Sequence, residues 1–147
     1  MKIDYVSADE TDIAPILEQS KALIERYEDF GSIDREMVFA WITRKMQNCI
    51  GEYTRILCDG ETAGWIRAHE EGERLELDDL FILPRFQNRG IGTATLQKFI
   101  RESGKTISFY VFSRNVGAVR LYERLGFRAT ETVSHTRHIM ERRAEQA

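Results

Sequence analysis

The spacing of apolar residues changes several times along the chain, and each change predicts a new element. A short strand is predicted over residues 2–6, followed by a helix over 13–27 whose apolar residues recur with a period of about 3.6. Asp9 and Asp12 stand where they can cap this helix. Residues 28–34 interrupt the pattern, and a second predicted helix then carries on one face Met37, Val38, Trp41, Ile42 and Met46.

From residue 53 the period shortens to two, which is typical of strands. Strands are predicted over residues 53–58 and 62–68, joined by a tight turn at Asp59-Gly60, and over 74–83. The rest of the chain predicts helices over 90–102 and 115–125 and strands over 106–112, 128–133 and 136–141. This order predicts one α/β (α+β) domain over residues 1–147, a mixed seven-stranded sheet with four helices on its faces.

The fourth predicted strand contains a slip in the alternation. Leu75 and Leu77 are two residues apart, as are Leu80 and Ile82, but the step between the two pairs is three. A β-bulge at residues 78–79 would keep all four side chains on one face and would bend the strand away from its neighbour. The bend either shapes the sheet alone or leaves backbone groups that an extended ligand can pair with.

A glycine-rich loop follows this strand in the segment PRFQNRGIGTATLQKFI. Gly90 and Gly92 stand where the next helix begins, and successive N–H groups at a helix N-terminus form an anion site. Arg85 and Arg89 add positive charge nearby. The segment lacks the Lys-Ser/Thr of a Walker loop and the full G-x-G-x-x-G of a dinucleotide site, and a plain strand-to-helix turn is the alternative.

Two signatures in this order resemble the GNAT superfamily of acyl-CoA-dependent N-acetyltransferases. The first is Q-x-x-G-x-G at residues 87–92, and the second is NVGAVRLYERLGF at 115–127, after one more predicted strand. The resemblance is close over 75–127, and the remaining element order fits the same fold. It implies a mostly antiparallel sheet with a bulged fourth strand, and acetyl-CoA as co-substrate. The pyrophosphate would lie on the loop and the pantetheine arm between the fourth and fifth strands.

The resemblance also implies roles for individual residues. The backbones of Leu80, Phe81 and Ile82 would pair with the pantetheine amides. Asn115 would contact the pantetheine arm near the thioester, and it also stands where it can cap its helix. Tyr122 matches the tyrosine that protonates the leaving thiolate, although helical spacing alone makes it a core aromatic. The backbone N–H groups that would hold the pyrophosphate belong to Asn88, Arg89, Gly90, Ile91, Gly92 and Thr93.

The chemistry also requires a base, because a lysine-like amine has a pKa of about 10.4 and must lose a proton before it attacks. Glu76, Asp78 and Asp79 lie on or beside the bend. Alternation places Glu76 and Asp78 together on the face opposite the leucines, so these two are the preferred candidates. The alternative is that all three carboxylates are exposed or only attract a cationic amine. His135 and His138 fall on opposite strand faces, so no metal site is expected.

For the acceptor, the resemblance implies a site built from the turn at 27–34 and the strands at 133–138. The turn is acidic, and nearby aromatic side chains suited to an amine are Tyr27, Phe30 and Trp41. These features favour a small cationic amine or a peptide amine, and a solvated corner between two helices is the alternative. Family members of this size are often dimers, which leaves a homodimer open.

Composition narrows the remaining classes. The chain has 147 residues, 42% hydrophobic and 31% charged, and its net charge of −3 argues against nucleic acid as the main partner. Its only cysteines are Cys49 and Cys58, and its longest apolar run, 37–42, is far below the roughly 20 residues of a membrane span. We therefore expect a cytoplasmic protein. A non-catalytic acyl-CoA sensor, or a nucleotide-binding protein of another fold, is the alternative to an acetyltransferase.

Overall fold

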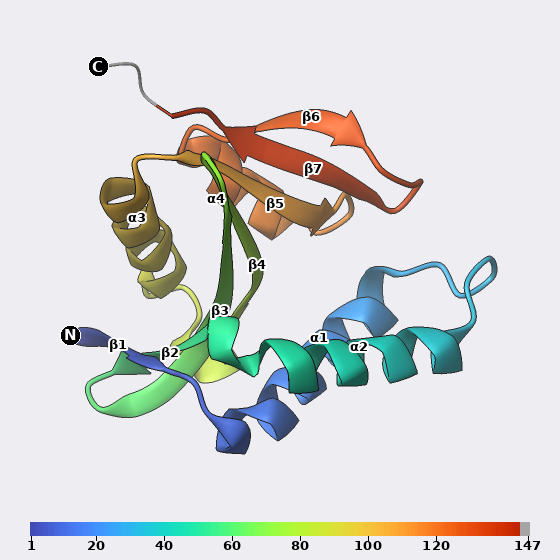
Figure 1. The fold of residues 1–147 in the computed structure, drawn as a ribbon, viewed down its shortest axis with the longest axis horizontal. Coiled ribbons are helices and arrows are strands. Elements are labelled where there is room, and N and C mark those ends of the chain that lie inside the picture. The colour runs from blue at the N-terminus through green and yellow to red at the C-terminus, as the bar shows by residue number, and fades with distance from the viewer. Residues whose placement is uncertain (145–147) are drawn as a thin grey trace.

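The computed structural model describes residues 1–144, which form one seven-stranded sheet with helices on both faces (Figure 1). The strands are β1 (Ile3–Ser7), β2 (Tyr53–Cys58), β3 (Glu61–Glu71), β4 (Arg74–Ile82), β5 (Thr106–Phe112), β6 (Arg128–Thr132) and β7 (Arg137–Arg142). The helices are α1 (Ile13–Tyr27), α2 (Arg35–Cys49), α3 (Ile91–Ser103) and α4 (Val116–Arg124), with short 3-10 turns at Glu10–Asp12, Ile50–Glu52 and Pro84–Phe86. The predicted element order and sheet are confirmed.

The strand order is β1-β2-β3-β4-β5-β7-β6, and β4 with β5 is the parallel pair among antiparallel ones. The Asp59-Gly60 turn has positive φ at both residues, +50° and +83°, which is the conformation that a two-residue hairpin requires. Gly126, two residues after the end of α4, has a left-handed φ of +93°, a conformation in which glycine commonly terminates a helix. Among residues 1–144 we find no helix with the length and apolar character needed to cross a membrane.

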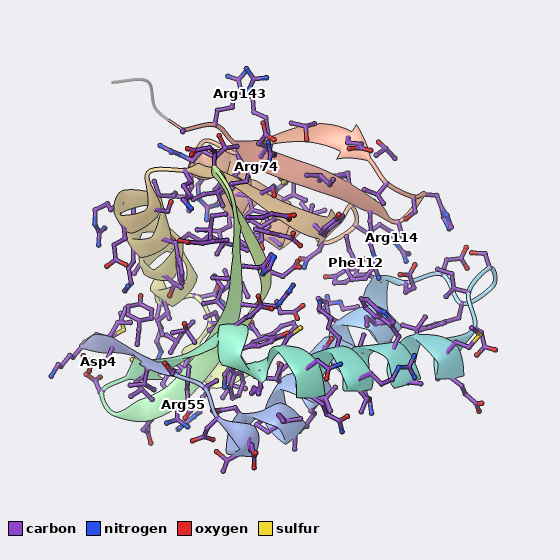
Figure 2. All side chains as sticks on the ribbon, in the orientation of Figure 1. Asp4, Arg55, Arg74, Phe112, Arg114 and Arg143 are labelled. Carbon is purple, nitrogen blue, oxygen red and sulfur yellow. The ribbon has the colours of Figure 1, made fainter. Side chains whose placement is uncertain are left out.

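Two layers of side chains cover the sheet. On one face, α3 and α4 pack on the buried leucines of β4 through side chains that include Leu96 and Tyr122. On the other face, α1 and α2 pack on Tyr53, Trp65 and Phe81. Figure 2 shows Phe112 at the end of β5 next to this helical layer, where it joins a third cluster. The sheet is therefore buried from both sides near its centre.

The predicted apolar face of α2 splits into two stripes. Ile42 and Met46 are buried against the sheet, whereas Met37 is 70% exposed and Trp41 is 54% exposed. The sequence places all five apolar residues on one face, and the structure buries part of that face and leaves Met37 and Trp41 exposed. Positions four apart stack along a helix, so these two residues form a stripe beside the buried one.

The start of α1 also differs from the prediction. Asp9 caps the short 3-10 turn before the helix, and its side chain accepts a hydrogen bond from the Thr11 N–H. Asp12 completes the capping box and is buried, where its carboxylate accepts a hydrogen bond of 2.9 Å from the Trp65 indole. Asp12 therefore ties the entry of α1 to β3 in addition to its local role.

The parallel pair opens almost at once. Register contacts between β4 and β5 are confined to Arg74–Glu76 against Thr106–Ser108. Beyond Glu76 the two strands diverge, so β4 loses its β5 partner where a closed sheet would continue. The predicted gap between the fourth and fifth strands is thus present in the fold.

A bulge in β4 accompanies this opening. Residues 79–80 together face the single residue Ile66 of β3, because the pairs that flank it are Arg67–Asp78 and Trp65–Phe81. The bulge therefore begins one residue later than predicted, and Asp79 adopts a left-handed φ of +52° in it. The leucine and isoleucine side chains on both sides of the bulge do pack against the same core cluster, as predicted.

Candidate active site

Two cavities meet at the gap between β4 and β5. One, of about 560 Å³, lies between the sheet and helices α1 and α2, and we call it the helical-layer cavity. The other, of about 570 Å³, extends from the gap to the loop before α3, and we call it the loop cavity. Both are lined by Leu80, Ala118 and Tyr122. A ligand can therefore extend from the loop to the helical layer past these three residues.

The loop is shaped to hold an anion. Asn88 and Gly90 have left-handed φ angles of +61° and +79°, and α3 begins directly after Gly90. The first helical bond from Ala94 to the Gly90 carbonyl leaves the N–H groups of residues 91–93 without partners inside the helix. Unpaired N–H groups and the positive end of the helix dipole favour a phosphate at this point.

Gln87 has a structural role that the sequence alone did not predict. Its side-chain amide donates a hydrogen bond of 2.9 Å to the carbonyl of Ile82, which ties the loop to the end of β4. The Arg89 guanidinium lies 5.5 Å from the centre of the Phe86 ring, and Arg89 does not line the loop cavity. The Arg89 guanidinium thus lies against Phe86, beside the loop cavity rather than in its lining.

Most of the predicted coenzyme contacts line the loop cavity. They are Leu80, Ile82, Asn88, Gly90, Ile91, Gly92, Thr93 and Tyr122. The opposite wall comes from α4 and includes Gly117, Leu121 and Arg124, which the sequence did not single out. Gly117 carries no side chain and keeps this wall open, and Arg124 adds a positive charge.

Backbone alternation separates Phe81 from its neighbours on β4. The Leu83 N–H donates to the Ala63 carbonyl at 2.8 Å, so Leu83 and Phe81 turn their polar groups toward β3. Ile82 turns its polar groups the other way, toward the gap. The backbone of Phe81, one of the predicted coenzyme contacts, is therefore used in pairing with β3. Its side chain is buried on the face of the sheet that α1 and α2 cover.

Tyr122 stands where the two cavities join. It is 6% exposed, and its ring stacks on Phe109 with 4.4 Å between ring centres. Within the described residues its hydroxyl makes no hydrogen bond. Burial, together with the nearby charges of Asp78 and Asp79, raises the pKa of this phenol, so it stays protonated at neutral pH. Tyr122 is thus a buried O–H donor that faces open space.

Asp78 lines the helical-layer cavity near Tyr122. Burial and the adjacent Asp79 charge raise the pKa of Asp78 to about 7, with Glu76 adding to the increase and Lys45 and Arg67 opposing it. The carboxylate lies 3.4 Å from the Arg67 guanidinium. A carboxyl group with a pKa near neutrality can accept a proton from an amine and release it again.

The two neighbouring carboxylates are in different situations. Glu76 lines the same cavity and makes no hydrogen bond or ion pair with the described residues. Asp79 accepts a hydrogen bond of 2.5 Å from the Tyr53 hydroxyl and lies 3.9 Å from the Lys45 ammonium. Asp79 is therefore held by the fold, whereas Glu76 is free to meet a ligand.

Arg67 is part of a polar network that the sequence did not predict. Its guanidinium donates to Glu52 at 2.9 and 3.1 Å, and the other carboxylate oxygen of Glu52 contacts His69. Burial alone would raise the pKa of Glu52, but hydrogen bonds from His69 and Arg67 hold it below its usual value. Glu52 thus keeps the Arg67 charge next to Asp78.

Asn115 fulfils its predicted capping role and also lines the helical-layer cavity. Its side-chain oxygen accepts a hydrogen bond of 3.3 Å from the Ala118 N–H at the start of α4. Its side-chain NH₂ group is not used by that cap.

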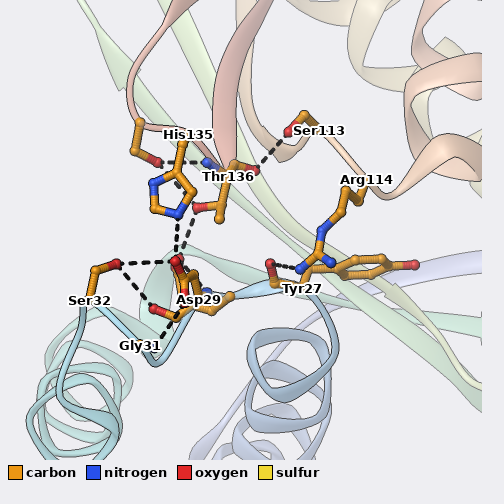
Figure 3. Close-up of polar contacts among 10 residues, drawn as sticks. Tyr27, Asp29, Gly31, Ser32, Ser113, Arg114, His135 and Thr136 are labelled. Carbon is orange, nitrogen blue, oxygen red and sulfur yellow. Dashed lines mark hydrogen bonds and ion pairs between the residues drawn. The ribbon is translucent and has the colours of Figure 1, made fainter.

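Polar contacts join the turn between α1 and α2 to the loop before β7 (Figure 3). The buried Glu28 carboxylate accepts bonds of 2.9 Å from both Thr136 and Arg137. Asp29 lies 2.8 Å from the His135 ring nitrogen. Burial opposes ionisation of Glu28, but its hydrogen bonds, led by that from Thr136, hold its pKa below the usual value. The two acidic residues at the start of the turn are thus paired within the protein.

The three aromatic residues predicted to lie near an acceptor differ in whether they line the helical-layer cavity. Tyr27 stacks on Phe112, and Phe30 contacts Phe39, so neither lines the helical-layer cavity. Of the three candidates, Trp41 does line it. His135 and His138 are not brought together at a metal site: the described part of the chain holds no group of three or more His, Cys, Asp or Glu suited to a metal ion.

Comparison with known proteins gives consistent matches. A model of the acetyltransferase (GNAT) family matches residues 16–127. An uncharacterized N-acetyltransferase of Methanocaldococcus jannaschii is 37% identical over 82 residues, which are 53% of this chain and 35% of that protein. The spermine/spermidine N(1)-acetyltransferase of Bacillus subtilis is 37% identical over 59 residues, 37% of this chain and 39% of that protein. The matched stretches thus span little more than a third of these relatives.

Solved structures share the fold over nearly the whole chain. The PaiA N-acetyltransferase of Thermoplasma acidophilum, in complex with coenzyme A, has a TM-score of 0.72 at 20% identity, covering 97% of this chain and 99% of that one. The ribosomal-protein-S18-alanine N-acetyltransferase of Escherichia coli has a TM-score of 0.68 at 21% identity, covering 99% and 96%.

Proposed function

Since the chain belongs to the acetyltransferase (GNAT) family, we propose that it transfers an acetyl group from acetyl-CoA directly to a primary amine. The observation that carries this proposal is the junction of the two cavities. A buried O–H donor, Tyr122, lies where an anion-binding channel meets a cavity that contains a carboxyl group of near-neutral pKa, Asp78. These are the parts that acyl transfer to an amine requires.

The residues of the loop cavity fit the coenzyme. The N–H groups of residues 91–93, which have no partner within the helix, and the positive charge of Arg124 suit the pyrophosphate. The Ile82 carbonyl is bonded to Gln87, but its N–H faces the gap and suits a carbonyl of the pantetheine arm. Gly90 and Gly117 leave room, because a Cβ added at either would meet no atom within 4 Å. This channel leads to Tyr122, where the thioester would lie.

The reaction needs a base on the acceptor side. When bound, acetyl-CoA supplies a thioester whose carbonyl carbon bonds to the amine nitrogen while its bond to sulfur breaks. Asp78 accepts a proton from the incoming ammonium, which frees the nitrogen lone pair for attack. Glu76, which lines the same cavity and has no partner in the described part of the chain, attracts the ammonium and is the second candidate for the base.

The leaving sulfur needs an acid. Tyr122 donates its hydroxyl proton to the sulfur, and its raised pKa keeps that proton available at neutral pH. The nitrogen loses its second proton as the amide forms, and that proton returns the Tyr122 phenolate to the phenol. Asp78 and Tyr122 thereby act at opposite ends of the reaction, so both substrates are held at once and no acyl-enzyme is required. The products are an N-acetyl amine and free coenzyme A.

The first test is thermal melting of the purified protein with saturating acetyl-CoA, and separately with NAD and with ATP. A ligand at 100 times its dissociation constant stabilises a protein by about 2.7 kcal/mol, a shift of roughly 5–10 °C for a domain of this size. We expect a shift with acetyl-CoA alone, followed by amine-dependent thiol release. A shift without thiol release for any amine would favour a non-catalytic acyl-CoA sensor.

A further inference from the structure

The whole lining of the helical-layer cavity, and not only its acidic residues, indicates which kind of acceptor it binds. We propose that the acceptor is a small primary amine with a single flat apolar body, such as an arylalkylamine; this inference rests on the proposed function. The acceptor's amine end would lie at Asp78 and Glu76, and its apolar body between Trp41 and Tyr110.

The walls of the cavity away from β4 are largely apolar. Its lining includes Leu23 and Ile24 of α1 and Ile42 of α2. Two aromatic side chains on different layers complete it: Trp41 of α2 is 54% exposed, and Tyr110 of β5 is 46% exposed. Large aromatic surfaces left open beside a cavity favour a ligand that covers them, and flat rings are suited to stacking on them.

The charges in the cavity accommodate one ammonium group. Glu76 lines the cavity and has no partner among the described residues, and Asp78 has a pKa raised to about 7. The other charges that line it are Asp79 and three cations, Lys45, Arg67 and Arg137. A polyamine would bring a second ammonium toward these cations without a second free carboxylate, which is unfavourable.

The cations are also engaged within the protein, which argues against an acceptor that carries a carboxylate and needs a cation to pair with it. Arg137 is paired with Glu28 at 2.9 Å and lies 4.7 Å from the centre of the Phe112 ring. Lys45 lies 3.9 Å from Asp79 and 5.4 Å from the Trp41 ring centre. An apolar body on the acceptor needs none of these cations as a partner.

The contacts between the α1–α2 turn and the β7 side limit the size of the acceptor. Asp29 pairs with His135, and the Arg114 guanidinium, in the loop between β5 and α4, donates to the Tyr27 carbonyl at 2.9 Å (Figure 3). Glu28 also bonds to Thr136 and Arg137. A peptide chain that passed between these two segments would have to break them. The cavity of about 560 Å³ is in the range of small-molecule sites.

The test measures acetyl-CoA-dependent thiol release and acetylated product with phenethylamine, tryptamine, phenylalanine, spermidine and a pentapeptide with a free N-terminus. We expect the two arylalkylamines to give the highest kcat/KM, at least about tenfold above the others, since a lost stacked ring costs roughly this factor. Higher kcat/KM for spermidine or the peptide overturns the inference and leaves the proposed acetyltransferase intact. Higher kcat/KM for phenylalanine overturns it by showing that Lys45 or Arg137 binds a carboxylate.

Variants of α2 test the stacking directly. Trp41→Ala should raise KM for phenethylamine about tenfold, with the acetyl-CoA melting shift unchanged and partial rescue by Trp41→Phe. Met37→Ala is the matched control: it lies one turn earlier, is 70% exposed and does not line the cavity. Equal effects of Trp41→Ala and Met37→Ala would contradict the inference. If no amine is acetylated although acetyl-CoA binds, the proposed function fails and the inference fails with it.

Discussion

Asp78 on β4 and Tyr122 on α4 face one cavity from two layers of the fold, and after burial the charge of Asp78 is the largest influence raising the pKa of the Tyr122 phenol. The residue that would take the first proton thus also helps to retain the proton that Tyr122 would give. The pKa values of Asp78 and Tyr122 are both raised, and the main cause is the same, because both side chains are shielded from water. This relationship makes their separate roles testable.

Removal of the Asp78 carboxylate should change the pH dependence of the reaction. In the wild type, kcat/KM should rise as pH passes through about 7, because Asp78 must be ionised to act as the base. Asp78→Asn should abolish that rise and lower kcat about 100-fold, a typical contribution of a general base. The dependence of kcat/KM on pH, measured in Asp78→Asn and in Glu76→Gln, shows which of the two carboxylates is the base. If the rise near pH 7 is unaltered in Asp78→Asn, the base is another group.

Ionisation of Asp78 should lower the stability of the folded protein at high pH. The pKa of Asp78 in the folded chain lies above the ordinary aspartate value of 3.8, so the folded chain binds more protons than the unfolded one between these two pKa values. The contribution of Asp78 to stability is therefore full below the unfolded pKa and is lost as pH rises through about 7. Asp78→Asn should raise the melting temperature by a few degrees at about pH 8 and not at about pH 4. Equal shifts at both pH values would mean that Asp78 ionises normally.

Tyr122→Phe separates chemistry from packing. Phenylalanine retains the ring that stacks on Phe109, so acetyl-CoA affinity should change less than about twofold, while kcat falls about 100-fold with loss of the acid. Single-turnover kinetics and a binding titration measure the two quantities. Equal losses in both would identify Tyr122 as a packing residue of the core.

Gly90→Glu should abolish acetyl-CoA binding. The substitution places a carboxylate where the N–H groups of α3 would meet a phosphate, and the two negative charges repel. Gly60→Glu is the matched control, because Gly60 also has a positive φ, +83° against +79°, and also has no atom within 4 Å of an added Cβ. Both variants should lose a similar amount of stability, but only Gly90→Glu should lose the melting shift with acetyl-CoA. Retention of that shift would remove the phosphate assignment.

Gly64 tests the close approach of β3 to the bulged strand. A Cβ at this position would lie 1.9 Å from the carbonyl oxygen of Phe81, so Gly64→Ala must displace β4. We expect a loss of about 2 kcal/mol or more in the free energy of unfolding, measured by urea denaturation. Gly51→Ala, which meets nothing within 4 Å, should change it by less than about 0.5 kcal/mol. Similar values for the two variants would show that β4 moves without cost.

The sequence determined a large part of this fold because the signals involved are local. The period of apolar residues identified every strand and helix, and the Asp59-Gly60 turn and the step from Leu77 to Leu80 were visible within a few residues. The same holds for the loop at residues 87–92, whose glycines precede a helix. The exact bulge position and the exposure of Trp41 were not predicted, since both depend on which surface the neighbouring layer covers.

The tertiary structure alone decided which charges are free. Glu28 and Thr136 are 108 positions apart, and no local pattern indicates that they bond, yet this contact turns an apparent acceptor residue into an internal one. Asp79 likewise accepts a hydrogen bond from Tyr53, whereas Glu76 has no partner within residues 1–144. Identical carboxylates acquire different roles because burial and distant partners set their pKa values, and these are properties of packing rather than of sequence spacing.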